Sequence, residues 1–370
     1  MHFVCNLHIA RDPDQVNDSA QVNVLLTWSL SSSLTVFKGS GLHTQPPTDE
    51  SRACEPPHIA GRLSCALPTE LILVIWSTMA LTDLLMYGFT SRFNFGAIQA
   101  YLSRKRLSLF RPFFTDPLAF IRVLRRTKSI VSGSVALAFM VPATSLGWSP
   151  SDMDIYVPES SVGTWIGYLN VCGYKLKRPR KDRSSMYPVR PEIHEIVYLE
   201  QHVSGQRIDM IVAVNDLRTP IFRYHSTIIM NCLSADGFFS AYPLLTASLR
   251  GIMNPSAMIT LNIPPSHVAQ CYRKYDQRGF FIAERPSAWV GDEHRCGRSW
   301  YCPETLRHTA DWGCLFMKFR EEPYSVLDPR EDGSMARFES EFAVQWALGG
   351  YTCDGRREVL LPQLTIVPLL

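Results

Sequence analysis

The stretch SGSVALAFMVPATSLGWSPSDMDIYVP, residues 132–158, decides the fold. It begins with a Gly-Ser turn, continues through an apolar segment and ends in a strand-like run with two aspartates one residue apart. Successive side chains of a β-strand point to opposite faces. Asp152 and Asp154 therefore share one face, while Met153 and Ile155 share the other. The pattern predicts a strand with one packed apolar face and two carboxylates together on the opposite face.

A second apolar strand, QRIDMIVAV at residues 206–214, repeats this arrangement with one aspartate. Ile208 and Met210 share a face, which leaves Asp209 on the other. If the two strands are neighbours, Asp209 completes a cluster of three carboxylates. Carboxylates held so close repel one another unless a positive charge lies between them, and a divalent cation with oxygen ligands is the usual solution. We therefore expect a metal site, with Mg²⁺ as the ion.

The Gly-Ser turn before the apolar segment predicts an anion site. Gly133 and Ser134 stand where a strand passes into a helix. Backbone N–H groups at a helix start, together with a Ser hydroxyl, form a small phosphate-binding feature. Phosphate and metal features in one short stretch are typical of proteins that bind nucleotides.

In this order and context, Gly133, Ser134, Asp152, Asp154 and Asp209 resemble the nucleotidyltransferase superfamily with the polymerase-beta type fold. The resemblance covers residues 116–214 and implies an α+β protein with a mixed β-sheet flanked by helices. It implies two Mg²⁺ ions, both held by the first two aspartates, with the third binding the catalytic ion and assisting the incoming hydroxyl. The Ser would hold a nucleoside triphosphate. The implied activity is Mg-dependent transfer of a nucleoside monophosphate to a hydroxyl acceptor.

Two departures from the family pattern leave alternatives open. Seventeen residues separate Ser134 from Asp152, more than is usual, and PATSLGWSP at 142–150 lies among them. An extra basic segment, residues 175–192, separates Asp154 from Asp209. Either feature is compatible with a nucleotide-binding pseudoenzyme. The aspartates themselves have a purely structural explanation, as a strand-end cap or an ion pair with Arg207.

Residues 66–112 form a predicted helical segment of a different kind. Leu67, Pro68 and Glu70, followed by LTDLL at 81–85 and TSR at 90–92, resemble the F-box. This implies docking on a ubiquitin-ligase scaffold protein through residues 67–112, with the α/β domain as an inactive recognition module. As a whole, the chain also resembles uncharacterised fungal proteins that join an F-box-like segment to a nucleotidyltransferase-like domain. An amphipathic hairpin without a partner shares much of the pattern.

Composition sets the remaining limits. The 370 residues are 46% hydrophobic, and 37 basic against 34 acidic residues give a formal charge of +3, which provides no strong argument for nucleic acid or membrane. Ten scattered cysteines favour reduced thiols and an intracellular protein. The longest apolar run, residues 67–89, contains Glu70 and Asp83 and predicts soluble helices rather than a membrane span.

These observations predict four parts: a disordered leader (1–65), the F-box-like segment (66–112), the nucleotidyltransferase-like domain (113–260) and a C-terminal helper or irregular region (261–370). We expect an amphipathic helix over 116–128, and further helices over 216–253 and 267–281. The basic segment at 175–192 is a solvated loop, with nucleic-acid binding as the weaker interpretation. A late group of residues lacks the close CxxC pair that indicates zinc, and comprises His294, Cys296, Cys302, His308 and Cys314.

Overall fold

The computed structural model describes strands 7–9 and 24–26, and residues 67–145, 147–177, 191–257, 264–290, 296–319, 342–351, 359–360 and 363–368. The chain divides into two compact units, Met1–His58 and Ile59–Leu370. In the first, β1 (Leu7–Ile9) pairs antiparallel with β2 (Val24–Leu26). The rest of the predicted leader lies outside the described residues. All the candidate site residues belong to the second unit.

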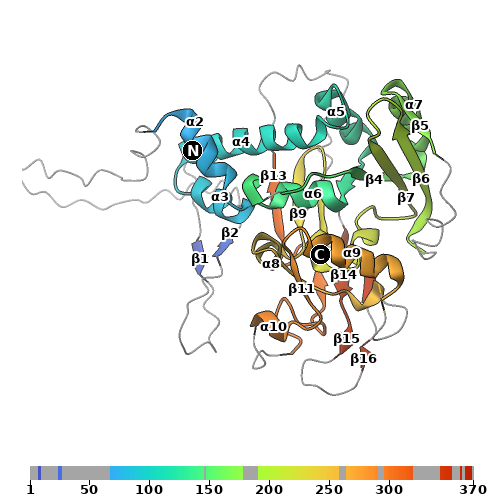
Figure 1. The fold of residues 1–370 in the computed structure, drawn as a ribbon. Helices are drawn as coiled ribbons and strands as arrows, with labels where there is room; N and C mark the ends of the chain where they lie inside the picture. Colours follow the sequence, from blue (N-terminus) through green and yellow to red (C-terminus); the bar gives the residue numbers. More distant parts are fainter. Residues whose placement is uncertain are drawn as a thin grey trace, which may run out of the picture. The chain divides into compact units, whose positions relative to one another are not determined.

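The centre of the second unit is an eight-stranded mixed sheet with the strand order β13-β9-β8-β3-β4-β7-β6-β5 (Figure 1). Only β4 and β7 pair in parallel, and the other neighbours in this sheet are antiparallel. The strands are β3 (Ile130–Ser132), β4 (Asp152–Pro158), β5 (Tyr174–Leu176), β6 (Ile193–Gln201), β7 (Arg207–Ala213), β8 (Asn231–Leu233), β9 (Gly237–Ser240) and β13 (Leu315–Lys318). The predicted mixed sheet is confirmed, including both aspartate-bearing strands.

Helices cover one face of this sheet. They are α2 (Thr69–Ser77), α3 (Leu81–Gly88), α4 (Arg92–Phe110), α5 (Pro117–Thr127), α6 (Gly133–Met140) and α7 (Val162–Val171). Met153 and Ile155 of β4 and Met210 of β7 are fully buried in one apolar cluster with side chains from α3 to α7. The alternation expected for β4 is confirmed, because these three residues point toward the helices while the aspartates occupy the other face.

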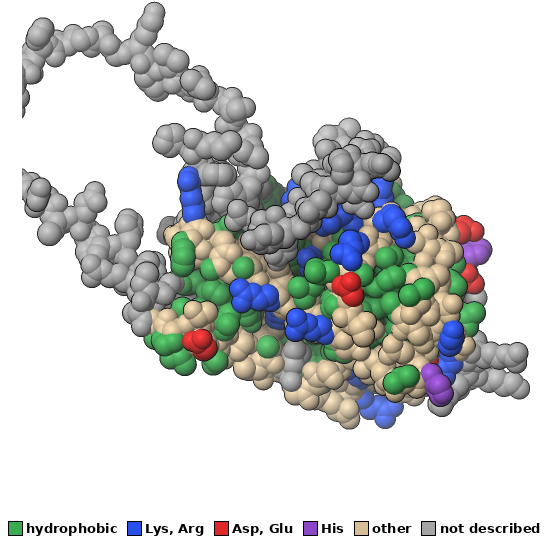
Figure 2. Space-filling model, turned by 90° about the horizontal axis from the view of Figure 1, so that it is seen from above, with side chains coloured by type: hydrophobic (Ala, Val, Ile, Leu, Met, Phe, Trp, Pro, Cys, Tyr) green, Lys and Arg blue, Asp and Glu red, His purple; other side chains and the backbone are tan. Residues whose placement is uncertain are grey.

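The expected amphipathic helix is α5. Asp116 is its N-cap and accepts hydrogen bonds from the N–H groups of Leu118 and Ala119, at 3.0 and 2.9 Å. Phe120 and Leu124 are fully buried, whereas Arg122 and Arg126 are exposed and the half-buried Arg125 pairs with Asp236. Figure 2 shows the molecule from above, with Lys and Arg side chains spread over this face and few acidic ones between them. This basic surface fits a solvated helix face.

The segment from 67 to 89 folds as two short helices, α2 and α3. None of the helices in the described ranges has both the length and the apolar character needed to cross a membrane. Leu81 and Leu84 of α3 are fully buried in the helix-side cluster, and Trp76 of α2 stacks edge-on against Tyr101 of α4 at 5.5 Å. The helices therefore pack on the α/β part of the same compact unit.

The prediction of helices over 216–253 is mostly wrong. This segment contains the strands β8 and β9, which extend the central sheet, then only five helical residues in α8 (Pro243–Ala247), and β10 (Arg250–Ile252). Short 3-10 turns η3 (Thr219–Arg223) and η4 (Thr227–Ile229) precede them. All residues of β8 and β9 are buried, and such strands have continuous apolar runs that periodicity cannot distinguish from buried helix.

The C-terminal region covers the other face of the sheet. Its elements are η5 (Pro255–Ala257), α9 (Ser266–Asp276), β11 (Phe281–Ala283), α10 (Ser287–Val290), β12 (Arg307–His308), β14 (Phe342–Ala347), β15 (Gly350–Tyr351), β16 (Val359–Leu360) and β17 (Gln363–Pro368). Tyr156 of β4 and Ile211 of β7 share an apolar cluster with Trp346 of β14. The helix expected over 267–281 is confirmed as α9 up to Asp276, after which a turn leads into β11. The domain boundaries at 112 and 260 stay predictions.

Candidate functional site

Strand register brings the predicted carboxylates together. In the parallel pair β4–β7, Asp154 lies directly opposite Asp209, and Asp152 lies opposite Arg207. Neighbouring strands are about 4.8 Å apart, so Asp154 and Asp209 project side by side from one face. Asp209 is 6% exposed, and Asp152 keeps about a quarter of its side chain accessible. The adjacency of the two strands, which the sequence left as a condition, is therefore met.

Gly133 is required where it stands, at the first position of α6. Its φ is +63°, a left-handed conformation that glycine adopts without strain. A Cβ on this residue would lie 1.9 Å from Oδ2 of Asp154. The missing side chain thus lets the Asp154 carboxylate lie directly against the start of α6, which brings the Gly-Ser turn and the aspartates into one site.

Ser134 follows at the same turn and is 3% exposed. Its hydroxyl is 3.5 Å from the carbonyl oxygen of Asp152, at the outer limit of a hydrogen bond. Ser132, just before the turn, donates to the carbonyl oxygen of Asn231 at 2.6 Å, which fixes the end of β3 to β8. The bond from Ser132 therefore anchors the predicted phosphate turn to β8, and Ser134 lies beside Asp152, the first residue of β4.

The electrostatics of the site are unbalanced. Burial raises the pKa of Asp154 well above its ordinary value, and the charges of Asp152 and Asp209 raise it further. Lys274 of α9 acts in the opposite direction and lowers it. Desolvation and like charges both disfavour the ionised carboxylate. A cation beside these oxygens would restore the charged form.

The donor set suits Mg²⁺ in its chemistry, because the three predicted ligands are all carboxylates. Their side chains do not converge in the arrangement shown, since no group of three or more His, Cys, Asp or Glu in the described ranges forms a metal site. Asp152 instead has Oδ2 4.0 Å from Nη2 of Arg207 and Oδ1 3.4 Å from the hydroxyl of Ser151. The ion-pair alternative thus has a counterpart at Asp152, whereas the half-buried Asp154 has no ion pair with a described residue.

Four further side chains near the aspartates were missed by sequence reasoning. The hydroxyl of Tyr224 is 2.8 Å from that of Tyr156. Burial raises the pKa of Tyr224, and the negative charge of Asp154 is one of the contributions that raise it further. The other three, Cys271, Lys274 and Arg278, come from α9 and the turn after it, and each interacts electrostatically with Asp152 or Asp154. Cys271 and Lys274, three residues apart, share one face of α9, and this spacing was the available signal. Nothing local related that face to the aspartates.

The segment 142–150, which lengthens the gap between Ser134 and Asp152, packs against this same region. Its Trp148 lies half-buried beside a cluster that contains Tyr275 and Phe280. The guanidinium of Arg278 stacks over the Trp148 ring, 4.0 Å from its centroid. Trp148 therefore packs against the C-terminal end of α9, while residues 143–145 of the segment are exposed.

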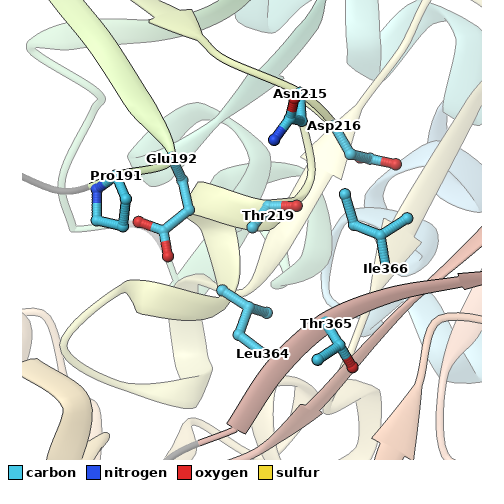
Figure 3. Close-up of a pocket in the computed structure, with 8 residues that line it drawn as sticks. All are labelled: Pro191, Glu192, Asn215, Asp216, Thr219, Leu364, Thr365 and Ile366. Atoms are coloured by element: carbon cyan, nitrogen blue, oxygen red, sulfur yellow. The ribbon is translucent and has the colours of Figure 1, made fainter.

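A separate pocket of about 260 Å³ lies beyond the other end of β7 (Figure 3). Its lining side chains are Pro191, Glu192, Asn215, Asp216, Thr219, Leu364, Thr365 and Ile366. Glu192 pairs with Arg223 at 3.2 Å and Asp216 with Arg218 at 2.5 Å, so both carboxylates are neutralised. None of the predicted site residues lines this pocket, and the candidate site rests on strand register instead.

The remaining sequence candidates divide by position. His294 and the basic segment from 178 to 190 lie outside the described residues; of the segment's first lysines, Lys177 pairs with Glu200 and Lys175 donates to Asn170. Of the late group, Cys302 accepts from the N–H of Gly297, and Cys314 accepts from Arg307. These contacts are structural. They do not form a metal site in the described ranges.

Comparisons with known proteins add little. No family model matches the chain, and no curated protein matches it. A solved structure that does match is the Thermotoga maritima CCA-adding enzyme complexed with tRNA_CCA, at 18% identity and a TM-score of 0.23. The match covers 32% of this chain and 26% of that enzyme. At this identity, coverage and TM-score the match carries no argument about this chain.

Proposed function

We propose that this protein is nucleotidyltransferase-like and transfers a nucleoside monophosphate from a nucleoside triphosphate to a hydroxyl acceptor, with pyrophosphate as the leaving group. The observation that carries the proposal is the register that places Asp154 opposite Asp209, with the backbone of Gly133 against the Asp154 carboxylate. Carboxylates on adjacent strands beside a helix start are the arrangement that such chemistry requires.

In this proposal, Asp154 and Asp209 would hold Mg²⁺, with Asp152 as the third ligand. When bound, the metal would stabilise negative charge on the phosphates and favour attack by the acceptor oxygen. Ser134 and the N–H groups at the start of α6 would bind and orient the phosphates. Asp209, which is buried, would accept the proton of the acceptor hydroxyl.

The test measures nucleotide binding by calorimetry, with and without Mg²⁺, for the wild type and the Asp152→Asn/Asp154→Asn double variant. The double variant removes two charges with little change in volume. We expect at least a 10-fold loss of Mg-dependent affinity, because a carboxylate contributes far more to Mg²⁺ binding than an amide. Glu159→Gln is the matched control, since this exposed carboxylate directly follows the far end of β4.

The outcomes separate enzyme from pseudoenzyme. Equal Mg-dependent binding by the double variant would refute the metal assignment. A labelled-triphosphate transfer assay then follows, with small-molecule, protein and RNA acceptors. RNA is included because the matched CCA-adding enzyme is complexed with tRNA. Tight Mg-dependent binding without transfer to any acceptor would favour the pseudoenzyme.

One observation favours a second function, docking on a ubiquitin-ligase scaffold protein through residues 67–112. On α2, the apolar side chains of Leu71, Val74 and Ile75 are 50%, 59% and 47% exposed. Pro68 is also exposed, whereas Leu67 and Ile72 are half-buried. An apolar stripe of this kind often marks a protein interface. Val74→Asp should abolish binding to a purified scaffold protein while Thr69→Asp, an exposed polar position on the same helix, should not.

A further inference from the structure

The side chain of Arg278 is held in an unusual way beside the aspartates. Its guanidinium stacks on Trp148 at 4.0 Å and lies 5.3 Å from the ring centroid of Tyr275. Planar stacking of this type orients a guanidinium and leaves its N–H edge available for hydrogen bonds. Two aromatic rings from separate parts of the chain therefore fix where this cation points.

One donor of that guanidinium has no acceptor. Nη1 of Arg278 is buried and makes no hydrogen bond to the described residues. A buried charged donor without a partner destabilises the folded chain, so its retention needs an explanation. A ligand that supplies an anionic oxygen at this point is the simplest one.

A second cation lies nearby on α9. Lys274 is in the last turn of this helix, and Arg278 follows in the turn after the helix ends at Asp276. Lys274 is close enough to affect the ionisation of Asp154, and Arg278 is close enough to interact with Asp152. Both are half-buried. Both cations therefore act electrostatically on the carboxylates, and an anion bound to them would lie near a metal that the carboxylates held.

We infer that Arg278 and Lys274 form a subsite for the terminal phosphates of a nucleoside triphosphate, with Trp148 as the residue that positions Arg278. This inference rests on the proposed nucleotide-binding function and adds its polyphosphate subsite. It also gives segment 142–150 a role, since that segment supplies the ring on which Arg278 stacks. Guanidinium recognises phosphate oxygens through paired, charge-assisted hydrogen bonds, which an ammonium or amide cannot reproduce.

The experiment compares two ligands, inorganic tripolyphosphate without metal and a nucleoside triphosphate with Mg²⁺, each measured by calorimetry on the full chain. A nucleoside monophosphate with Mg²⁺ serves as the ligand without terminal phosphates. For Arg278→Gln we expect about a 10-fold loss of affinity for both polyphosphate ligands, and no change for the monophosphate. Arg273→Gln is the matched control, because this exposed cation is on the same helix.

Variants of Trp148 test the positioning role. Trp148→Ala removes the stacking ring and should lower tripolyphosphate affinity by about 3-fold, whereas Trp148→Phe keeps a ring and should restore most of it. Arg278→Lys keeps the charge but loses the planar donor edge, and should resemble Arg278→Gln more than the wild type. Thermal unfolding of each variant confirms that the fold is retained.

The results distinguish this inference from the proposed function. If the wild type binds tripolyphosphate through Arg278 but shows no Mg-dependent nucleotide binding, the anion subsite stands and the proposed function fails. If Mg-dependent triphosphate binding is present and Arg278→Gln leaves both polyphosphate affinities unchanged, the inference is overturned and the proposed function stands. Absence of polyphosphate binding by the wild type overturns both.

Discussion

Two buried charged clusters on the same side of the sheet differ in how their charges are balanced. In one, Arg307 and Asp311 are 1% and 7% exposed and form two hydrogen bonds of 2.6 and 2.8 Å. Arg307 also donates to the carbonyl oxygens of Trp300 and Ala241. In the other cluster, Asp154 lies beside two further carboxylates and its pKa is raised. The first cluster is complete within the chain, whereas the second is completed by a ligand under our proposal.

The pKa directions express the same contrast. Burial opposes ionisation of Asp311, but hydrogen bonds and charge from Arg307 outweigh it and lower the pKa of Asp311. For Asp154, burial and two like charges act together and exceed the effect of Lys274. A satisfied buried ion pair serves structure, and an unbalanced cluster is a candidate for function. Burial does not distinguish the two clusters, whereas the balance of their charges does. Charge balance therefore indicates which cluster is a candidate for chemistry.

The largest expected effect is the loss of the Arg307–Asp311 pair. Asp311→Ala leaves a buried guanidinium without its carboxylate and should cost about 3–5 kcal/mol in the free energy of unfolding. Urea denaturation at pH 7 measures it. Because the folded pKa of Asp311 is lowered, its contribution is present above the ordinary carboxyl range and is lost as pH falls through the folded value. A loss below about 1 kcal/mol would contradict the structural role.

Asp154→Asn should behave in the opposite way in metal-free buffer. It removes a half-buried carboxyl whose charged form is disfavoured by desolvation and by the neighbouring carboxylates, so the free energy of unfolding should rise by about 1 kcal/mol. Mg²⁺ should raise the unfolding temperature of the wild type but not of this variant. A clear destabilisation without metal would show that Asp154 already has a balancing partner within the chain.

Lys105 of α4 offers a third buried charge for this comparison. Its ammonium donates to the carbonyl oxygen of Val141 at 2.7 Å, and burial lowers its pKa to about 7. The unfolded chain keeps the proton up to about pH 10.5, so the stability penalty is full below pH 7 and disappears toward pH 10. Lys105→Met should therefore gain about 1–2 kcal/mol near pH 6, after loss of one hydrogen bond.

The check is the difference in unfolding free energy between Lys105→Met and wild type, measured from pH 6 to pH 10. The difference should shrink steadily as the pH rises. A constant difference would mean that Lys105 stays protonated throughout this range and is balanced like Arg307.

The smallest effect concerns Arg207 and Asp152, which are 4.0 Å apart and 31% and 24% exposed. Arg207→Gln should change the free energy of unfolding by less than about 1 kcal/mol, because exposed pairs gain little over their solvated ions. Its effect on Mg-dependent nucleotide binding should be stronger than its effect on stability, since Asp152 would lose a competing partner. A stability loss above 2 kcal/mol would favour the structural explanation for Asp152.

The sequence predicted the local elements of the site well. The strand of Asp152 and Asp154, the strand of Asp209 and the helix that starts at Gly133 all lie where alternation and turn residues indicated. It failed over 216–253, where fully buried strands gave no alternation. It also failed to place Trp148 and Arg278 together, because residues 130 apart in the chain meet only through tertiary packing.

By itself, the sequence determined which side chains share a face, because alternation along a strand is a local property of the backbone. It also determined that residue 133 tolerates a left-handed conformation, since glycine has no Cβ. Only the tertiary structure decided that Asp154 lies opposite Asp209, that the Asp154 carboxylate fills the space beside Gly133, and that α9 brings its cations to them. Register and packing are global, because they depend on how all the apolar faces are buried together.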